Sequence, residues 1–130
     1  MLFFWFFDLM RILWLLLFIY FLGDVMEHIS ADELHNRVGN LTSDDLILDV
    51  RSATEFNDGH IEGAQNITHE EVTSEIDALK KYKNVYIHCK MGGRAKMAAE
   101  SLQGAGLDNI VCVSDGGMQR WEDMGWDLVK

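Results

Sequence analysis

Proline is absent from this chain of 130 residues, and cysteine occurs only twice. Two cysteines cannot form the framework of several disulfides that holds many small secreted domains together. No C-x-x-C pair and no cluster of histidine and cysteine has the spacing of a metal site. We therefore expect neither a disulfide scaffold nor a metal, and each cysteine needs its own explanation.

Positive charge is scarce as well. Lysine and arginine number 11 against 21 aspartates and glutamates, which gives a net charge of −10. Asp8 and Arg11 cancel each other, so the whole excess lies after residue 23. An acidic surface repels phosphate backbones, and we therefore expect no binding to nucleic acid. A soluble, solvated domain surface is sufficient to explain the excess.

Charged residues are nearly missing from the first 22 positions, MLFFWFFDLMRILWLLLFIYFL. A helix of that length spans roughly 33 Å, which matches the hydrocarbon thickness of a bilayer. Asp8 and Arg11 are three residues apart and share a helix face, where pairing lowers the cost of burying them. No A-x-A cleavage pattern follows. We predict that residues 1–23 form a hydrophobic segment and that 1–22 anchor the chain in a membrane by a single span.

Two questions about this segment stay open. Arg11 is the only cation before Arg37, so the sequence does not decide which side of the membrane the domain faces. Translation from Met26 would leave the acidic region complete, and the protein would then be cytoplasmic.

The rest of the chain, residues 24–130, has the length of one domain. Short apolar runs predict strands at 46–50, 63–67, 84–89 and 109–114. Helical patterns begin near residues 30, 52, 68 and 94, and a last short helix or turn is expected near 117–125. Strands that alternate with helices predict an α/β domain, in which a mainly parallel sheet of about five strands lies between helices.

One loop, HCKMGGR at residues 88–94, carries the chemistry. Cys89 follows a predicted strand, and sites in open parallel sheets form at the carboxyl ends of strands. Gly92 and Gly93 allow a tight turn, from which backbone N–H groups and a helix N-terminus converge on the sulfur. Lys90 and Arg94 favour the thiolate. Cys89 alone would fit a buried structural cysteine. The residues around it predict an exposed, activated nucleophile instead.

Several separated motifs between about residues 28 and 127 resemble the rhodanese-like (sulfurtransferase) family. The segment CKMGGR resembles the C-x-x-G-x-R active-site loop of that family. LILDVRSATEFNDGHIEGAQNI resembles its D-V-R, E-F, G-H-I and G-A-x-N-I signature, and DGGMQRW resembles its closing G-G-x-x-x-W segment. Glu62 replaces a usual proline, and Thr68 and His69 depart from the usual end of the signature. These departures affect a turn and not the active-site loop.

The resemblance implies a two-step reaction without a cofactor. Cys89 would take the outer sulfur from a small anionic donor such as thiosulfate, forming a persulfide, and pass it to a thiol, cyanide or a protein acceptor. In this role, Cys89 is the catalytic residue. The substrate would be bound by the loop residues Lys90, Met91, Gly92, Gly93 and Arg94.

Two alternatives remain. A non-enzymatic module that binds or relays persulfide sulfur at the membrane would need the same loop. Cysteine phosphatases and arsenate reductases use a similar loop with five residues between cysteine and arginine, whereas Cys89 and Arg94 have four between them. The shorter loop favours a single sulfur atom over a tetrahedral oxyanion.

Three further residues are candidates for supporting roles. Asp49 and Arg51 follow a strand and lie near the expected crevice, but we favour an ion pair in which Arg51 binds Glu55 and fixes the loop. For His60, in DGHIEGA, we favour a structural hydrogen bond over proton transfer.

Two residues near the predicted nucleophile are expected to be structural. His88 precedes Cys89 on a strand, so its side chain points to the opposite face and makes it a poor general base. Cys112 alternates with apolar neighbours and is expected to be buried.

Overall fold

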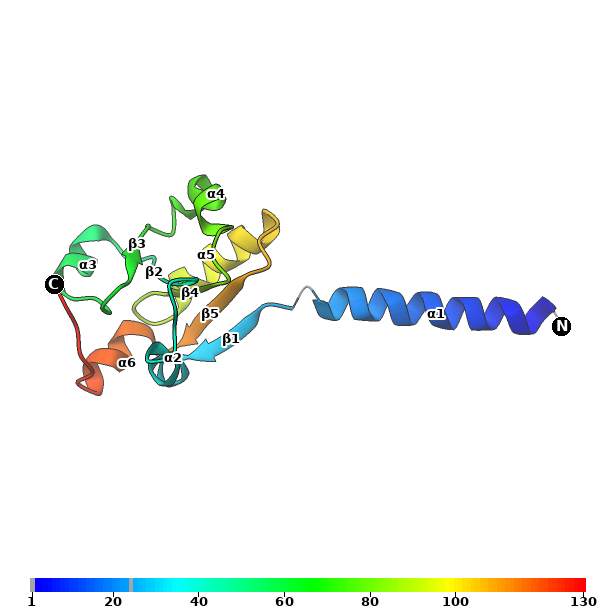
Figure 1. Ribbon diagram of the computed structural model, residues 1–130, viewed down its shortest axis with the longest axis horizontal. Helices are drawn as coiled ribbons and strands as arrows, with labels where there is room; N and C mark the ends of the chain where they lie inside the picture. Colours follow the sequence, from blue (N-terminus) through cyan, green and yellow to red (C-terminus); the bar gives the residue numbers. More distant parts are fainter. Residues whose placement is uncertain (1, 24) are drawn as a thin grey trace.

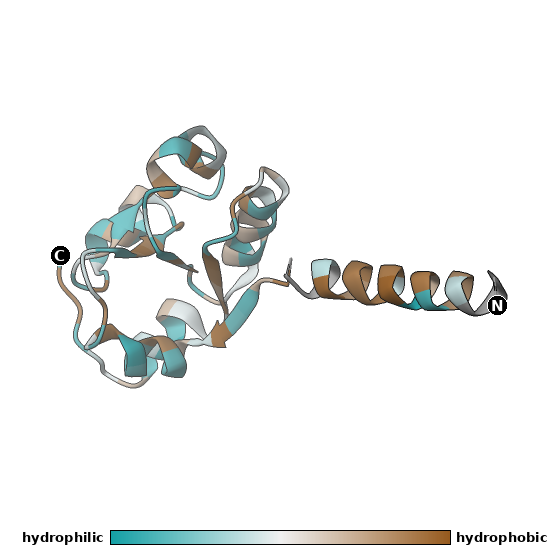
Figure 2. Cartoon of the chain, turned by 45° about the vertical axis from the view of Figure 1, so that its right-hand side comes forward, coloured by the Kyte–Doolittle hydropathy of each residue, from teal (hydrophilic) through white to brown (hydrophobic). Residues whose placement is uncertain are grey.

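The computed structural model describes residues 2–23 and 25–130. Helix α1 (Leu2–Gly23) leads away from the rest of the chain (Figure 1). The side chains of residues 5–20 are all exposed, and most are apolar (Figure 2). In the described ranges, no helix has the combined length and apolar character needed to cross a membrane. The anchor predicted for residues 1–22, of which Met1 lies outside the described residues, has no support from this finding and stays a prediction.

The described part of the domain contains a sheet of five parallel strands, as the sequence predicted. The strand order is β1-β5-β4-β2-β3. This order puts β4, which precedes Cys89, in the middle of the sheet. The strands are β1 (Glu27–Ser30), β2 (Asp45–Asp49), β3 (Gln65–Asn66), β4 (Asn84–His88) and β5 (Ile110–Asp115).

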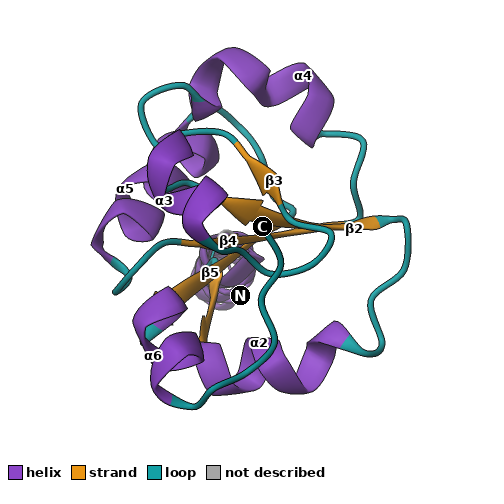
Figure 3. Ribbon diagram, turned by 90° about the vertical axis from the view of Figure 1, so that its left-hand side faces the viewer, coloured by secondary structure: helices purple, strands orange, loops and turns teal. Residues whose placement is uncertain are grey.

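Helices cover both faces of this sheet (Figure 3). One face packs against α2 (Ala31–Val38) and α6 (Gly117–Asp123). The other packs against α5 (Gly93–Gly104), α4 (Ile76–Leu79) and the 3-10 helix η1 (Val72–Glu75). Helix α3 (Ala53–Asp58) follows β2 at the carboxyl ends of the strands. The α/β architecture is therefore a sheet between two helical layers.

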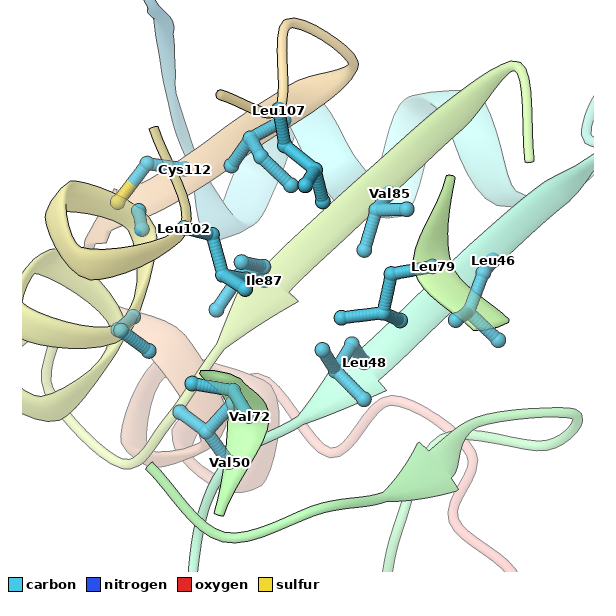
Figure 4. Close-up of a cluster of buried hydrophobic side chains, with 14 of the residues drawn as sticks. Leu46, Leu48, Val50, Val72, Leu79, Val85, Ile87, Leu102, Leu107 and Cys112 are labelled. Carbon is cyan, nitrogen blue, oxygen red and sulfur yellow. The ribbon is translucent and has the colours of Figure 1, made fainter. Parts of the chain in front are cut away.

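Alternation along the central strands divides the core between the two faces. Leu46 and Leu48 of β2 pack on the α5 side together with Val85 and Ile87 of β4 (Figure 4). Ile47, between the two leucines, packs on the side of α2 and α6. Strands buried on both faces appear in sequence as continuous apolar runs, which is why β2 and β4 were predictable.

Helix starts also follow the predicted caps. The Ser30 hydroxyl accepts a hydrogen bond of 3.1 Å from the Glu33 N–H at the start of α2. Ser52 and Glu55 form a reciprocal capping box at the start of α3. The helix expected from Thr68 instead begins at Val72 with the 3-10 turn η1, and the strand expected at 63–67 shrinks to β3.

Strand β1 was not predicted. It is an edge strand, and within the described part of the chain it pairs with β5 alone. Glu27 and His28 are exposed, and Ile29 is the one buried residue of the four. A strand with a single buried side chain shows no apolar run and no alternation long enough to recognise.

Candidate active site

Cys89 lies directly after β4, and its side chain is next to the first turn of α5. Its side chain is buried, with 1% of the residue surface exposed. The sulfur accepts hydrogen bonds from the backbone N–H groups of Gly92, at 3.1 Å, and Ala95, at 3.3 Å. The expectation of an exposed cysteine is therefore wrong, because the loop folds back over Sγ and places it at the bottom of a cradle of backbone N–H groups.

The loop after Cys89 offers further donors. Within the described part of the chain, the backbone N–H groups of Lys90, Met91, Gly93 and Arg94 have no hydrogen-bond acceptor. The side chains of Lys90 and Met91 are exposed at the rim. Unbonded N–H groups at a loop and helix N-terminus form a binding place for negative charge. The cradle is thus suited to hold an anionic group attached to Sγ.

Gly92 makes the turn of this cradle possible. Its φ of 114° lies in the region that favours glycine, and it is the N-cap of α5. A β-carbon at this position would overlap the backbone carbonyl of Ser114 on β5. The tight turn predicted from the glycine pair is therefore present at Gly92. By contrast, a β-carbon on Gly93 would meet no atom.

Helix α6 supports the loop from the other side. The N–H of Met118 donates to the carbonyl of Cys89 and that of Gln119 to the carbonyl of Lys90, both at 2.9 Å. Gly117, with a φ of 41°, lies against the same two carbonyl groups. The segment DGGMQRW therefore fixes the backbone of the loop. Its role was not recognised from the sequence, although its glycine pair was visible.

Arg94 forms a two-pronged ion pair with Glu55 of α3. Nη1 donates to Oε1 at 2.7 Å and Nη2 to Oε2 at 3.0 Å, with about a third of each side chain exposed. The hydrogen bonds from Arg94 are the main reason that the pKa of Glu55 falls to about 2. The predicted pair between Arg51 and Glu55 is therefore wrong. The E-F motif contained the true partner of Arg94, but 39 residues separate the two.

Arg51 binds Asp49 instead. Its Nε and Nη2 donate to the Asp49 carboxylate at 3.0 and 2.7 Å, and Nη2 also donates to the carbonyl of Gly59 at 2.8 Å. Asp49 and Arg51 are both buried. These contacts tie the end of β2 to the turn after α3. The ion pair between Asp49 and Arg51 is therefore buried, and it fixes the segment between β2 and Gly59, which carries Glu55.

His60 makes the structural hydrogen bond that the sequence predicted. Its Nδ1 donates to the Phe56 carbonyl at 2.9 Å, and the two rings stack with centroids 3.7 Å apart. The backbone of His60 also pairs with Val129. His60 thereby joins α3 to the C-terminal segment.

His88 and Cys112 are both buried. His88 lies on the face of β4 opposite Cys89, with Nε2 4.0 Å from an Asp49 carboxylate oxygen, and neither ring nitrogen has a hydrogen-bond partner among the described residues. Burial lowers the pKa of His88. Cys112 packs on the α5 side of β5 (Figure 4), and burial raises the pKa of its thiol to about 11. The predicted burial of Cys112 and orientation of His88 are confirmed.

The similarity of this chain to known proteins agrees with this geometry. Residues 30–124 match the Rhodanese-like domain family. Thiosulfate sulfurtransferase GlpE of Shewanella oneidensis is 31% identical over 77 residues, covering 59% of this chain and 75% of GlpE. YrkF of Bacillus subtilis, a proposed sulfur carrier protein, is 35% identical over 75 residues, covering 58% of this chain.

The match in solved structures extends over most of the domain. A rhodanese-related protein from Thermoplasma volcanium superimposes with a TM-score of 0.66 at 30% identity, covering 79% of this chain and 97% of the other. The chain spans only 59% and 40% of the lengths of the Bacillus subtilis relatives YqhL and YrkF. The family match, the fold and the cysteine loop together place this chain in the rhodanese-like domain family.

Proposed function

We propose that this protein is a thiosulfate sulfurtransferase that carries sulfur as a persulfide on Cys89. The observation that carries this proposal is the position of Sγ in the 89–94 loop, where it accepts hydrogen bonds from two backbone N–H groups, while four further N–H groups of the same loop are unbonded among the described residues. A thiolate or persulfide anion accepts such bonds. The likeness to GlpE supports this assignment.

The first step loads the enzyme. The thiolate of Cys89 attacks the outer sulfur of thiosulfate, a new S–S bond forms, and the bond between the two sulfur atoms of thiosulfate breaks. Sulfite leaves with the electron pair of that bond, so no external oxidant or reductant is needed. The outer sulfur, now a persulfide anion, remains in the cradle.

The second step transfers the outer sulfur from Cys89 to an acceptor. A thiolate of a small molecule or of a protein attacks the outer sulfur of the persulfide, and the thiolate of Cys89 leaves. Cyanide in place of the thiol gives thiocyanate by the same displacement. The N–H groups of Gly92 and Ala95, which already bind Sγ, stabilise the thiolate as it reappears.

A relay module is the second candidate, and the likeness to a proposed sulfur carrier supports it. Such a module forms the same persulfide but delivers it only to a specific partner. The phosphatase alternative is not favoured, because four residues between Cys89 and Arg94 leave a narrower loop than the five that surround a tetrahedral oxyanion.

Mass spectrometry of the thiosulfate-treated protein tests the proposal. We expect one added sulfur atom, mapped to Cys89, in the wild type and in Cys112→Ala, and none in Cys89→Ser. Sulfur on Cys112, or none on either residue, would overturn the assignment. Multiple turnovers with thiosulfate and cyanide then separate the enzyme from a relay module, which loads but does not turn over.

We also propose that residues 1–22 attach this activity to a membrane. Exposed apolar side chains along α1, such as Trp5 and Trp14, support the proposal. The sulfur acceptor would then be a thiol or a protein that reaches the membrane surface.

A further inference from the structure

We propose that Glu55 tunes the charge of the donor that Cys89 accepts: it lowers the reactivity of Cys89 toward doubly charged thiosulfate relative to singly charged sulfane donors, such as thiosulfonates and organic persulfides. This inference rests on the proposed function of Cys89. It arises from the ion pair between Glu55 and Arg94 at the edge of the loop.

The pair changes the charge that an arriving donor meets. The loop itself contributes two cations, Lys90 and Arg94, which suit a dianion. Glu55 places a carboxylate against Arg94 through two hydrogen bonds of 2.7 and 3.0 Å. Beside the backbone N–H groups, the one cationic side chain of the loop that Glu55 leaves free to act on the donor is Lys90, which is exposed and screened by water.

The carboxylate is also fixed in this position. The Ser52 hydroxyl donates to Glu55 Oε1 at 3.0 Å, and the Ser52 N–H lies 3.4 Å from the same oxygen. The N–H of Glu55 in turn donates to the Ser52 hydroxyl at 3.2 Å. A donor that needs the two Nη groups of Arg94 must therefore displace a carboxylate that the start of α3 holds. A donor with one negative charge gains less from Arg94 and loses less to Glu55.

Singly charged donors satisfy the chemistry of the first step. With a thiosulfonate, the thiolate of Cys89 attacks the terminal sulfur and a sulfinate leaves with the electron pair. With an organic persulfide, the attack on the outer sulfur releases a thiolate. Each step forms one S–S bond to Cys89 and breaks one bond to the transferred sulfur, so the product is the same persulfide.

Two donors that differ by one charge test the inference. Methanethiosulfonate carries a methyl group in place of one charged oxygen of thiosulfate, and both release an oxidised sulfur leaving group. The rate of persulfide formation on Cys89 is measured with each donor at several concentrations, using full-length wild type and Glu55→Gln. Glutamine also fits the capping box, so α3 is expected to keep its start. Glu122→Gln removes the same charge from an exposed position on α6 and is the matched control.

In Glu55→Gln, we expect the second-order rate constant with thiosulfate to rise about three- to tenfold relative to that with methanethiosulfonate, because one negative charge near the donor is gone. Glu122→Gln is expected to leave the ratio of the two rate constants unchanged. A ratio in Glu55→Gln within about twofold of the wild type would overturn the inference, since the carboxylate would then have no effect on the discrimination between the two donors. If instead the proposed function is wrong, the result is different, because neither donor then adds sulfur to Cys89 in the wild type.

Discussion

Gly117 lies so close to Cys89 that a β-carbon on the glycine would overlap the carbonyl oxygen of the cysteine. Next to it, the Met118 N–H donates to the same oxygen at 2.9 Å. The φ of Gly117 is 41°, which a residue with a side chain rarely adopts. The start of α6 can therefore touch the backbone of the active-site loop only where no side chain intervenes.

Gly117→Ala is expected to lose both stability and sulfur loading. The added methyl group must push α6 and the loop apart, and the free energy of unfolding should fall by about 2–4 kcal/mol, as for a strained backbone with an overpacked contact. Urea unfolding and mass spectrometry after thiosulfate treatment measure the two effects. Gly39→Ala is the control, because a β-carbon there meets no atom and φ is −67°. A Gly117→Ala variant that equals this control in stability and loading would contradict the account.

The parts of the fold that the sequence predicted are those where neighbours in the chain share one environment. The central strands β2 and β4 are buried on both faces and show as apolar runs. The caps at Ser30 and Ser52 bond to residues three positions away. Edge strand β1 has no such signal, because its pairing with β5 is made by backbone groups that every sequence possesses.

The candidate site divides in the same way. The order of residues in the CKMGGR loop is local, and the resemblance of that loop to a known family led to Cys89. The partner of Arg94 was not predictable from spacing, since Glu55 also satisfies a capping box and Arg51 was nearer in sequence. Arg51 binds Asp49 and not Glu55 because Asp49 is buried. A buried carboxylate needs a cation, and Arg51 lies beside it.

Because of the ion pair between Glu55 and Arg94, the free energy of unfolding should decrease at acidic pH. The pKa of Glu55 is about 2 in the folded protein and about 4.5 when unfolded, so its contribution is complete above pH 4.5 and is lost as the pH falls toward 2. Glu55→Gln should therefore be less stable than the wild type at pH 6, by about 1 kcal/mol or less because the pair is partly exposed, and equal to it near pH 2. Urea unfolding across this pH range checks the result. A constant difference between the two proteins would mean that the pair does not titrate as described.

His88 should make the protein less stable in mild acid. Burial lowers its pKa below the ordinary value of about 6.5, so the unfolded chain binds a proton that the folded chain does not. Above pH 6.5, His88 therefore does not lower the free energy of unfolding. As the pH falls below that value, the free energy of unfolding decreases. His88→Leu removes two buried ring nitrogens that make no hydrogen bond among the described residues, and the variant should be at least as stable as the wild type, with a larger gain at pH 5 than at pH 8. A larger gain at pH 8 would contradict this sign.

Cys112 should be unreactive in the folded protein. Its thiol is buried and its pKa is raised to about 11, so almost none of it is thiolate at neutral pH. Treatment of Cys89→Ser with iodoacetamide at pH 7.5 should give no alkylated product until the protein is unfolded in urea. Rapid alkylation of Cys112 under native conditions would show that β5 and α5 separate readily, and its predicted structural role would be wrong.

The membrane attachment predicted for residues 1–22 is tested by fractionation of cells that express the full chain. Apolar side chains on α1, including Trp5, Trp14 and Tyr20, are exposed to solvent in the isolated chain, and burial in lipid would remove roughly 25 cal/mol of unfavourable free energy per Å² of this surface. We expect the full chain in the membrane fraction and a variant that starts at Met26 in the soluble fraction, with equal sulfur loading on Cys89. Full-length protein in the soluble fraction would exclude the attachment. Protease treatment of intact spheroplasts then places the domain: digestion means that it faces outward, and protection means that it faces the cytoplasm.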